Sequence, residues 1–389
     1  MRLLYLSCDP GVPVLGNKGA SVHVREMVRA FAALGASVLV ASPRVQPEGD
    51  HLGDVAELIE IDGIRPTAHR SARSLRQSMA AQAEQVAAIA KDRQVDAIYE
   101  RLALFGASGI EAAAYLDVPH ILEVNAPLSE EALRFRSLPH SDEAFRTEAR
   151  VCASTDHAFA VSEALAARLV RGGVAPSKVT VAPNGVDPAK FEHRQQRARR
   201  GSRFILGFAG SLKPWHGVSV LLEAFARARR ARPSVRLEII GTGPDRASVA
   251  AARVPARTLT DHGALPHAAA VGVMATWDVG VAPFLPMPDF YFSPLKVVEY
   301  MAAGICAVAS DLGQIRTLLG DGDRGVLVEP GNAEALAEAV VELVDDRARA
   351  AQLGSRARAF ALQSLTWRSN ASRALHVLTT SAKLPVSAR

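Results

Sequence analysis

Residues 204–217 read FILGFAGSLKPWHG, an apolar run that leads directly into a loop with two glycines, a lysine and a histidine. The run from Phe204 to Ala209 has the length and composition of a buried β-strand. The glycines allow the backbone of the loop to approach a ligand closely. A helical pattern follows, so this stretch predicts a strand, a candidate ligand-binding loop and a helix in succession.

The same alternation continues in both directions from this stretch. Apolar strands separated by alanine-rich helices predict βαβ units, in which the connecting helices cover both faces of a parallel sheet. The fold class is therefore α/β, with two successive doubly wound halves. The expected strands are Leu3–Ser7, Ser37–Ala41, Asp96–Tyr99, His120–Val124, Ala158–Val161, Val179–Ala182, Phe204–Ala209, Val235–Ile240, Val279–Ala282, Ile305–Ala309 and Gly325–Val328.

The alternation pauses between the two halves. Residues 183–188 form the dense turn signal Pro-Asn-Gly-Val-Asp-Pro, and the segment 193–203 is basic and weakly apolar. We interpret the basic segment as solvated, with nucleic acid binding as the weaker alternative. The sequence thus predicts a first domain over 1–183, a linker over 184–203 and a second domain over 204–364. Ligands of doubly wound sheets bind at the carboxyl ends of the strands, so the site is expected there.

The composition of the 389 residues is typical of a soluble globular protein. Apolar residues make up 49% and charged residues 22%, and the sequence has neither a membrane-spanning run nor a secretory signal. The 45 basic and 40 acidic residues leave a net charge of +5, which is too even to indicate a nucleic acid partner. Cys8, Cys152 and Cys306 lack the spacing of zinc sites or disulfide frameworks. We therefore expect a cytoplasmic protein with buried thiols.

The loop from Gly11 to Gly19 follows the first expected strand and leads into a helix. The free amide groups at a helix start favour an anion, so Gly16, Lys18 and Gly19 are candidate phosphate or substrate ligands. A nucleotide-triphosphate loop would require Gly-Lys-Ser/Thr, which this loop lacks. A flexible turn between strand and helix is the alternative interpretation.

The loop of residues 210–217 is a second candidate for binding phosphate. Lys213 and His216 are its ligands in this interpretation, whereas in the alternative one Lys213 is a solvated charge and Trp215 only packs. A third Gly-rich segment, Gly241-Thr242-Gly243-Pro244, follows an expected strand, but a lone Gly-x-Gly is a weak nucleotide signal.

The most informative segment is SPLKVVEYMAAG at residues 293–304, which has the marks of a helix. Ser293 is expected as the N-cap and Pro294 as the first helical residue, with the final glycine as terminator. Lys296 then lies in the first turn, where the helix dipole disfavours a cation by about 0.3–1 kcal/mol. A bound diphosphate would reverse that sign, and Glu299, one turn deeper on the same face, could accept hydrogen bonds from sugar hydroxyls. A surface Lys–Glu pair is the alternative.

Other patterns of catalytic or metal-binding residues are absent from the sequence or weak. Asp321-Gly322-Asp323 lies between glycines and is interpreted as a turn before a strand. There are no paired histidines at metal-ligand spacing and no Gly-x-Ser-x-Gly nucleophile motif. We therefore expect no metal site.

Taken together, these segments resemble the retaining glycosyltransferases of family 4, which have the GT-B fold. The resemblance covers most of the chain. It implies two Rossmann-like doubly wound domains facing across a cleft, and a final helix, about residues 365–389, that returns to the first domain. It also implies a nucleotide-sugar donor bound mainly by the second domain and an acceptor bound mainly by the first. The segments that carry it are Gly16–Gly19, Glu123–Pro127, Val181–Asp187, Gly210–Gly217, Gly241–Pro244 and Ser293–Gly304.

The resemblance assigns roles to residues of the second domain. Glu299 matches the family glutamate that binds the donor ribose. A neighbouring loop matches the one whose backbone amides face the donor sugar and phosphates, and Gly243 is a further donor-binding candidate. The residues of the matching loop are Phe292, Ser293, Pro294 and Leu295.

The chain departs from the family pattern at two places in the second domain. Ser211 and His216 stand where the family usually has the basic pair that binds the diphosphate. Neutralisation of the phosphates is therefore expected from Lys213, Lys296 and a protonated His216. Tyr291 stands where the family has a second glutamate, and the nearby Asp289 is a candidate substitute.

A third departure lies in the first domain. Glu100 and Arg101 stand where the family often has a histidine that contacts the 6-hydroxyl of the sugar. We take Arg101 as a catalytic candidate and Glu100 and Asn125 as acceptor-binding candidates. The sequence offers no evident protein base, and in the family's usual mechanism the departing phosphate deprotonates the acceptor on the same face. The resemblance therefore implies retention of configuration without an essential metal.

These inferences predict a hexosyltransferase that uses a nucleotide-diphosphate sugar, most often a UDP-sugar in this family, as co-substrate and needs no cofactor. A nucleotide-sugar epimerase and a non-catalytic nucleotide-sugar-binding protein are the alternatives. The acceptor can be a small molecule, a glycan or a lipid-linked sugar, and the oligomeric state stays open. The arginines at positions 65, 70, 73 and 76 are expected to precede an alanine-rich helix of the first domain. Peripheral membrane contact is one interpretation of them, and a solvated basic face is the other.

Overall fold

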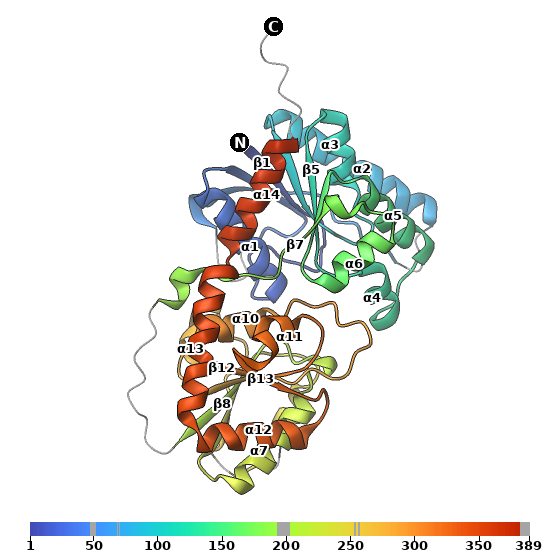
Figure 1. Cartoon of the computed structure of the whole chain (residues 1–389). Helices are drawn as coiled ribbons and strands as arrows, with labels where there is room; N and C mark the ends of the chain where they lie inside the picture. Colours follow the sequence, from blue (N-terminus) through green and yellow to red (C-terminus); the bar gives the residue numbers. More distant parts are fainter. Residues whose placement is uncertain are drawn as a thin grey trace. The chain divides into compact units, whose positions relative to one another are not determined.

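The computed structural model describes residues 1–46, 52–67, 69, 71–192, 203–252, 254–255 and 257–381. The chain forms two compact units. Unit 1 consists of Met1–Pro183 and the residues from Trp367 onward, and unit 2 consists of Asn184–Thr366. Each unit is built on its own parallel β-sheet with helices packed on it (Figure 1).

The sheet of unit 1 has seven strands. They are β1 (Arg2–Ser7), β2 (Ser37–Ser42), β3 (Ala56–Glu60), β4 (Ala97–Arg101), β5 (His120–Val124), β6 (His157–Ala160) and β7 (Val179–Val181). Their order across the sheet is β3-β2-β1-β4-β5-β6-β7, so the first strand lies in the interior. Five of the six residues of β1 are buried, as is expected of a strand with helices on both faces.

The first helix of unit 1 buries one apolar face. In the first helix, Val24, Val28 and Phe31 are fully buried on one face, and Gly35, at φ 88°, follows the helix end. The last helix of the chain packs beside this first helix (Figure 1). The helices are α1 (Gly19–Ala33), α2 (Ala72–Asp92), α3 (Ser108–Leu116), α4 (Leu128–Phe135), α5 (Ser141–Ser154), α6 (Glu163–Arg171) and α14 (Trp367–Ser381), with the short 3₁₀ turns η1 (Gly53–Val55) and η2 (Pro176–Lys178).

The sheet of unit 2 has six strands. They are β8 (Phe204–Ala209), β9 (Val235–Ile240), β10 (Leu259–Asp261), β11 (Val279–Ala282), β12 (Cys306–Ser310) and β13 (Gly325–Val328). Their order is β10-β9-β8-β11-β12-β13, which places β8 and β11 side by side in the interior. The chain reverses its direction of travel across the sheet between these two strands, and such a switch point is where ligands of doubly wound sheets bind.

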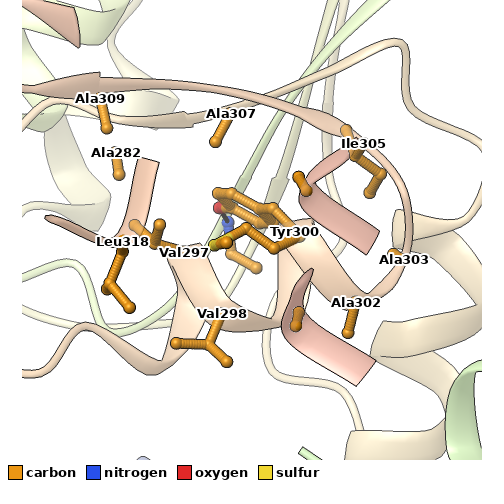
Figure 2. Close-up of a cluster of buried hydrophobic side chains, with 14 of the residues drawn as sticks. Ala282, Val297, Val298, Tyr300, Ala302, Ala303, Ile305, Ala307, Ala309 and Leu318 are labelled. Carbon is orange, nitrogen blue, oxygen red and sulfur yellow. Dashed lines mark hydrogen bonds between the residues drawn. The ribbon is translucent and has the colours of Figure 1, made fainter. Parts of the chain in front are cut away.

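Helix α10 (Leu295–Ala302) of unit 2 is packed into the core along nearly its whole length. Figure 2 shows the ring of its Tyr300 surrounded by small and branched apolar side chains, among them Ala307 and Val297. The helices of unit 2 are α7 (Val218–Ala231), α8 (Arg246–Ala250), α9 (His267–Met274), α10 (Leu295–Ala302), α11 (Gln314–Leu319), α12 (Ala333–Asp345) and α13 (Arg347–Ser364), with the 3₁₀ turns η3 (Pro188–Phe191), η4 (Pro214–His216) and η5 (Gly320–Gly322).

The structure confirms the eleven expected strands to within one or two residues and adds two more, β3 and β10. Both added strands lie at an edge of their sheet, and their burial is only partial. Because an edge strand buries less apolar surface, its sequence carries a weaker hydrophobic signal.

The segment predicted as a linker differs from expectation where the structure describes it. Val186 and Phe191 are 2% and 4% exposed and belong to the core of unit 2. The amide of Val186 also donates to the carbonyl of Leu365, and unit 2 extends to Thr366. The remainder of the predicted linker, residues 193–202, lies outside the described residues.

Three smaller expectations can also be compared with the structure. Cys8, Cys152 and Cys306 are free and buried, as the sequence indicates. Arg73 and Arg76 lie within α2 rather than before it, and Arg70 is outside the described residues. Among the helices that the structure describes, none is long and apolar enough to cross a membrane.

Candidate functional site

The loop after β8 approaches the neighbouring loops so closely that glycine is required. Gly217 has φ 67°, and a Cβ atom there would lie 1.8 Å from the carbonyl oxygen of Pro283. Gly210 has φ 144°, and a Cβ atom there would lie 3.1 Å from Nζ of Lys296. The missing side chain of Gly210 therefore leaves room for the lysine beside the loop.

Lys296 is the most unusual side chain of unit 2. It is 8% exposed, and its buried Nζ has no hydrogen-bond partner among the described residues. The ammonium lies 4.0 Å from the ring centroid of Phe208 and 5.0 Å from that of Phe284, as in cation–π contacts. Burial lowers the pKa of Lys296 from 10.5 to about 7. An uncompensated buried cation of this kind is poised to bind an anion.

His216 is neutral in this arrangement, which corrects the prediction that it is protonated. Burial and the nearby charge of Lys296 lower the pKa of His216 to about 2. Its Nδ1 donates a hydrogen bond to the carbonyl of Ser211, at the other side of the same loop. Lys213 is exposed and lies 4.8 Å from the ring centroid of Trp215. The loop therefore offers one exposed cation and one neutral imidazole.

Helix α10 is anchored to the end of β8 by Tyr300. The Tyr300 hydroxyl accepts a hydrogen bond of 2.8 Å from the amide of Ala209, the last residue of the strand. Its ring fits against Gly280 on β11, where a Cβ atom would lie 2.6 Å from the ring. This packing fixes the first turn of α10, and with it Lys296, beside the Gly210 loop.

Ser293 does not cap α10, which corrects the prediction. The residue before the helix is Pro294, and no side chain caps the first turn. The Ser293 hydroxyl instead accepts a 2.9 Å hydrogen bond from the amide of Asn184, whose side-chain amide donates to the carbonyl of Ser293 at 2.6 Å. The Pro-Asn-Gly turn and the α10 segment, far apart in sequence, are thus joined. The first amides of α10 are left without a capping oxygen, as in an anion-binding helix start.

Glu299 lies one turn beyond Lys296 and is 8% exposed. Its Oε1 lies 2.6 Å from Nε2 of His267, the first residue of α9. A carboxylate can only accept a hydrogen bond, so Nε2 carries the proton. His267 was not identified from the sequence, because a single histidine outside any motif carries no signal.

The loops at this edge of the sheet are joined by backbone hydrogen bonds. The amide of Leu212 donates to the carbonyl of Thr242 at 2.9 Å, and the amide of Gly241 donates to the carbonyl of Gly263 at 2.7 Å. A Cβ atom at Gly243 would lie 2.6 Å from the carbonyl oxygen of Leu212. The loops after β8, β9 and β10 therefore form one continuous rim.

The aromatic residues before α10 form a cluster. The ring centroids of Tyr291 and Phe292 are 4.3 Å apart, and those of Phe292 and Phe290 are 5.4 Å apart. Tyr291 is 7% exposed, whereas Asp289 is exposed. The position of the second family glutamate thus holds a packed tyrosine.

Unit 1 contains a second polar cluster, centred on Glu123 at the end of β5. Oε1 of Glu123 accepts a 2.8 Å hydrogen bond from Arg101 and one from the Asn125 amide, and it lies 2.9 Å from Nε2 of His23. Oε2 accepts a 2.7 Å hydrogen bond from the Tyr99 hydroxyl. Burial by itself raises the pKa of Glu123, but His23 and Arg101 outweigh burial and hold that pKa at about 2. We call these five residues the Glu123 cluster.

The strand register explains the meeting of Arg101 and Glu123. They are direct partners across the parallel strands β4 and β5. His23 comes from α1, and its ring also contacts the ring of Trp367 in α14, with centroids 4.6 Å apart. The cluster thus joins the expected Arg101 and Asn125 with His23, which the sequence did not indicate.

Glu100 does not join this cluster, because alternate residues of a strand point to opposite faces. Its side chain is 1% exposed, and Oε2 lies 2.9 Å from Nε2 of His120. A Cβ atom at Gly109 would lie 2.3 Å from the same oxygen. Glu100 is therefore enclosed within unit 1 and is not placed to contact an acceptor, in contrast to the prediction.

The first Gly-rich loop is supported from within by Arg25. This side chain is 1% exposed, and its Nη1 donates to the carbonyl of Val14 at 2.9 Å and to that of Gly16 at 2.5 Å. Lys18 is exposed and donates to the carbonyl of Gly11 at 3.0 Å. The loop is thus an ordered structure that leads into a helix, as the sequence predicts, and α1 begins at Gly19.

Over the described part of the chain, no group of three or more histidine, cysteine, aspartate or glutamate side chains is arranged to hold a metal ion.

Comparison with known proteins gives the family. Residues 203–346 match the family model described as Glycosyl transferases group 1, and residues 17–190 match that described as Glycosyltransferase Family 4. A D-inositol 3-phosphate glycosyltransferase from Arthrobacter sp. (strain FB24) is 27% identical over 91% of this chain and 88% of its own. A phosphatidyl-myo-inositol mannosyltransferase from Mycolicibacterium smegmatis is 34% identical over 42% of each chain, so the match spans less than half of that relative.

The fold is similar to that of Alr3699/HepE from Anabaena, which was solved in complex with UDP-glucose. The TM-score is 0.72 and the identity 18%, over 98% of this chain and 100% of that chain. The two parallel sheets are those of the GT-B fold, as the sequence predicts. Since one glycosyltransferase model matches most of each unit, the chain belongs to the group 1 (family 4) glycosyltransferases.

Proposed function

We propose that the protein is a retaining hexosyltransferase that takes its sugar from a UDP-sugar bound by unit 2. The observation that carries this proposal is Lys296, a buried ammonium beside an uncapped helix start and the Gly210 loop, for which the described residues supply no hydrogen-bond partner. Cation, helix amides and glycine backbone are the groups that bind a diphosphate. A neighbour of the same fold, Alr3699/HepE, was solved with UDP-glucose, which supports the choice of nucleotide.

In this proposal different residues of unit 2 bind different parts of the donor. Lys296 and the first amides of α10 bind the diphosphate, and Lys213 adds positive charge from the exposed side of the loop. Glu299 binds the ribose hydroxyls, since it lies one helical turn, about 5 Å, further along the same face. The cation and dipoles are fixed before reaction and stabilise the charge that develops on the leaving diphosphate. With this positive charge supplied by the chain, we propose that no metal is required.

The acceptor is proposed to bind to unit 1 at the Glu123 cluster. Arg101 and Asn125 hold their positions through Glu123, and the Arg101 side chain is 12% exposed, so part of the guanidinium is accessible. We propose that the departing phosphate deprotonates the acceptor hydroxyl, since the sequence has no motif of a catalytic protein base. The names of the two relatives suggest an inositol-containing acceptor as the first one to test.

The proposed function is tested by incubating the chain with UDP-sugars and a panel of acceptors, and by measuring a hexose mass gain by mass spectrometry. The expected result is a mass gain that a chelator does not affect. The anomeric coupling constant of the product, measured by NMR, is expected to show that the α-configuration of the donor is preserved. UDP-sugar turnover to an epimer without acceptor would indicate the epimerase instead. Binding of UDP without any product across the panel would indicate a non-catalytic binding protein.

The assignment of the donor site is tested separately with Lys296→Met. UDP affinity, measured by calorimetry, is expected to fall about 100-fold, the cost of a lost charge-assisted contact. Lys91→Met is the matched control, because Lys91 also lies near an aromatic ring, 5.9 Å from the Tyr115 centroid, but in α2 of unit 1. Unchanged UDP affinity in the Lys296 variant would contradict the assignment.

A further inference from the structure

The pair of His267 and Glu299 occupies a particular place in unit 2. His267 begins α9, directly after β10, and Glu299 lies in α10, after β11. Strands β9 and β8 lie between β10 and β11 in the sheet. The 2.6 Å hydrogen bond from Nε2 of His267 to Oε1 of Glu299 therefore links the elements on the two sides of the Gly210 and Gly241 loops.

The bond also makes the two carboxylate oxygens of Glu299 different from each other. Oε1 is occupied by His267, while no hydrogen bond to Oε2 is found among the described residues. Both side chains are largely buried, with 11% of Glu299 and 17% of His267 exposed, so the carboxylate has little freedom to rotate. A single oxygen in a fixed direction remains for a ligand.

We propose that His267 is a positioning residue that makes the donor site selective for ribonucleotides. It fixes Glu299 so that Oε2 accepts a hydrogen bond from a ribose hydroxyl of the nucleotide whose diphosphate is bound at Lys296. This inference rests on the proposed function, because it assumes a nucleotide diphosphate at this site. A site built around a buried polar group discriminates strongly against a ligand without the matching hydroxyl, since the group is then left unpaired.

A second histidine in the same region provides a matched control. His262 lies five residues before His267, and its Nε2 lies 3.1 Å from Oε2 of Glu238. That glutamate is part of β9 and also accepts a 3.0 Å hydrogen bond from Nε1 of Trp277. The two His–Glu pairs are alike in chemistry, but only in the pair of His267 does the glutamate lie on the helix that carries Lys296.

The test compares the affinities of UDP and 2′-deoxy-UDP by calorimetry in two near-isosteric variants. In His267→Gln the amide nitrogen occupies the position of Nε2 and keeps the bond, whereas in His267→Asn it falls short of Glu299. The wild-type chain and His267→Gln are expected to prefer UDP by about tenfold or more. In His267→Asn the preference is expected to fall below threefold through weaker UDP binding, and His262→Asn is expected to keep the wild-type ratio.

Several outcomes would overturn the inference. A His267→Asn variant that still prefers UDP by tenfold shows that His267 does not act through Glu299. An equal loss of the preference for UDP in His267→Gln and in His262→Asn shows that the histidines have only a general structural role. Both leave the proposed function standing, because UDP still binds the wild-type chain. A wild-type chain that binds neither nucleotide overturns the proposed function together with this inference. Thermal unfolding of each variant confirms that the folded chain is being compared.

Discussion

The two units each hold a largely buried cation at the carboxyl edge of their sheet, and they differ in whether a carboxylate compensates its charge. In unit 1, Arg101 is paired with Glu123 at 2.8 Å. In unit 2, Lys296 faces aromatic rings, and its ammonium has no hydrogen-bond partner in the part of the chain that the structure describes. A desolvated charge costs free energy unless a counter-charge is near. The comparison teaches that unit 1 supplies its own counter-charge, whereas the ammonium of unit 2 has only aromatic rings beside it, which is why we propose that a ligand anion binds there.

The largest expected effect comes from removing the charge that compensates unit 1. Glu123→Gln removes the carboxylate that pairs with Arg101, and removal of one partner from a buried pair costs about 3–5 kcal/mol of unfolding free energy. Urea denaturation measures this loss. Glu131→Gln is the control, since Glu131 pairs with Arg136 at 3.2 Å on the surface and its loss is expected to cost at most about 1 kcal/mol.

The pH dependence of the unfolding free energy tests the role of Glu123 independently. Its pKa is lowered from 4.5 to about 2 in the folded chain, so its contribution to stability is present above pH 4.5. That contribution is lost as the pH falls from 4.5 towards 2. Stability curves of the wild-type chain and Glu123→Gln are therefore expected to converge in this window. Parallel curves would show that Glu123 is not the titrating group.

The opposite sign is expected for Lys296 in unit 2. The unfolded chain keeps the lysine proton up to pH 10.5, while the folded chain loses it near pH 7. The buried charge therefore destabilises the ligand-free chain fully below pH 7, and this destabilisation is relieved as the pH rises from 7 to 10.5. At pH 6, Lys296→Met is expected to raise the unfolding free energy by on the order of 3 kcal/mol. A destabilised variant would mean that Lys296 is already compensated within unit 2.

Much of the fold followed from the sequence because both faces of the inner strands are buried. Strands such as β8 and β11 are continuous apolar runs, and their ranges were predicted to the residue. The edge strand β3 consists of partly buried and exposed residues, two of them glutamates, and gave no such run. Local signals were therefore sufficient wherever burial was complete, and insufficient at the edges.

The site was predicted less completely, for a different physical reason. Lys296 was identified because a cation in the first turn of a helix conflicts with the dipole, which is a local property. His267 and His23 act through partners more than 30 residues away, Glu299 and Glu123, so neither has a local signal. The predicted cap at Ser293 was wrong for the same reason. Its hydroxyl has a distant partner, Asn184, which local rules do not include.

A smaller effect is expected from the pH dependence of ligand binding in unit 2. An anion requires the protonated Lys296, whose pKa is about 7 in the ligand-free chain. UDP affinity is therefore expected to fall by up to about tenfold for each pH unit above 7. Lys296→Arg retains its charge at all these pH values and is expected to show a flat profile between pH 7 and 9. Identical profiles for arginine and lysine would contradict titration of Lys296.

The smallest expected effect concerns the bond between Asn184 and Ser293, which holds the segment before α10. Asn184→Ala removes the 2.6 Å hydrogen bond to the carbonyl of Ser293, worth about 1 kcal/mol. Because this bond orients the start of the helix that carries Lys296, UDP affinity is expected to fall about threefold to fivefold. Asn370→Ala is the matched control, since Asn370 donates a comparable 2.8 Å bond to the carbonyl of Pro183 within unit 1. If both variants lose the same stability and only Asn184→Ala weakens UDP binding, the bond belongs to the ligand site of unit 2. Equal UDP affinities in the two variants would show that the bond has only a structural role. The contrast between the units would then rest on Lys296 alone.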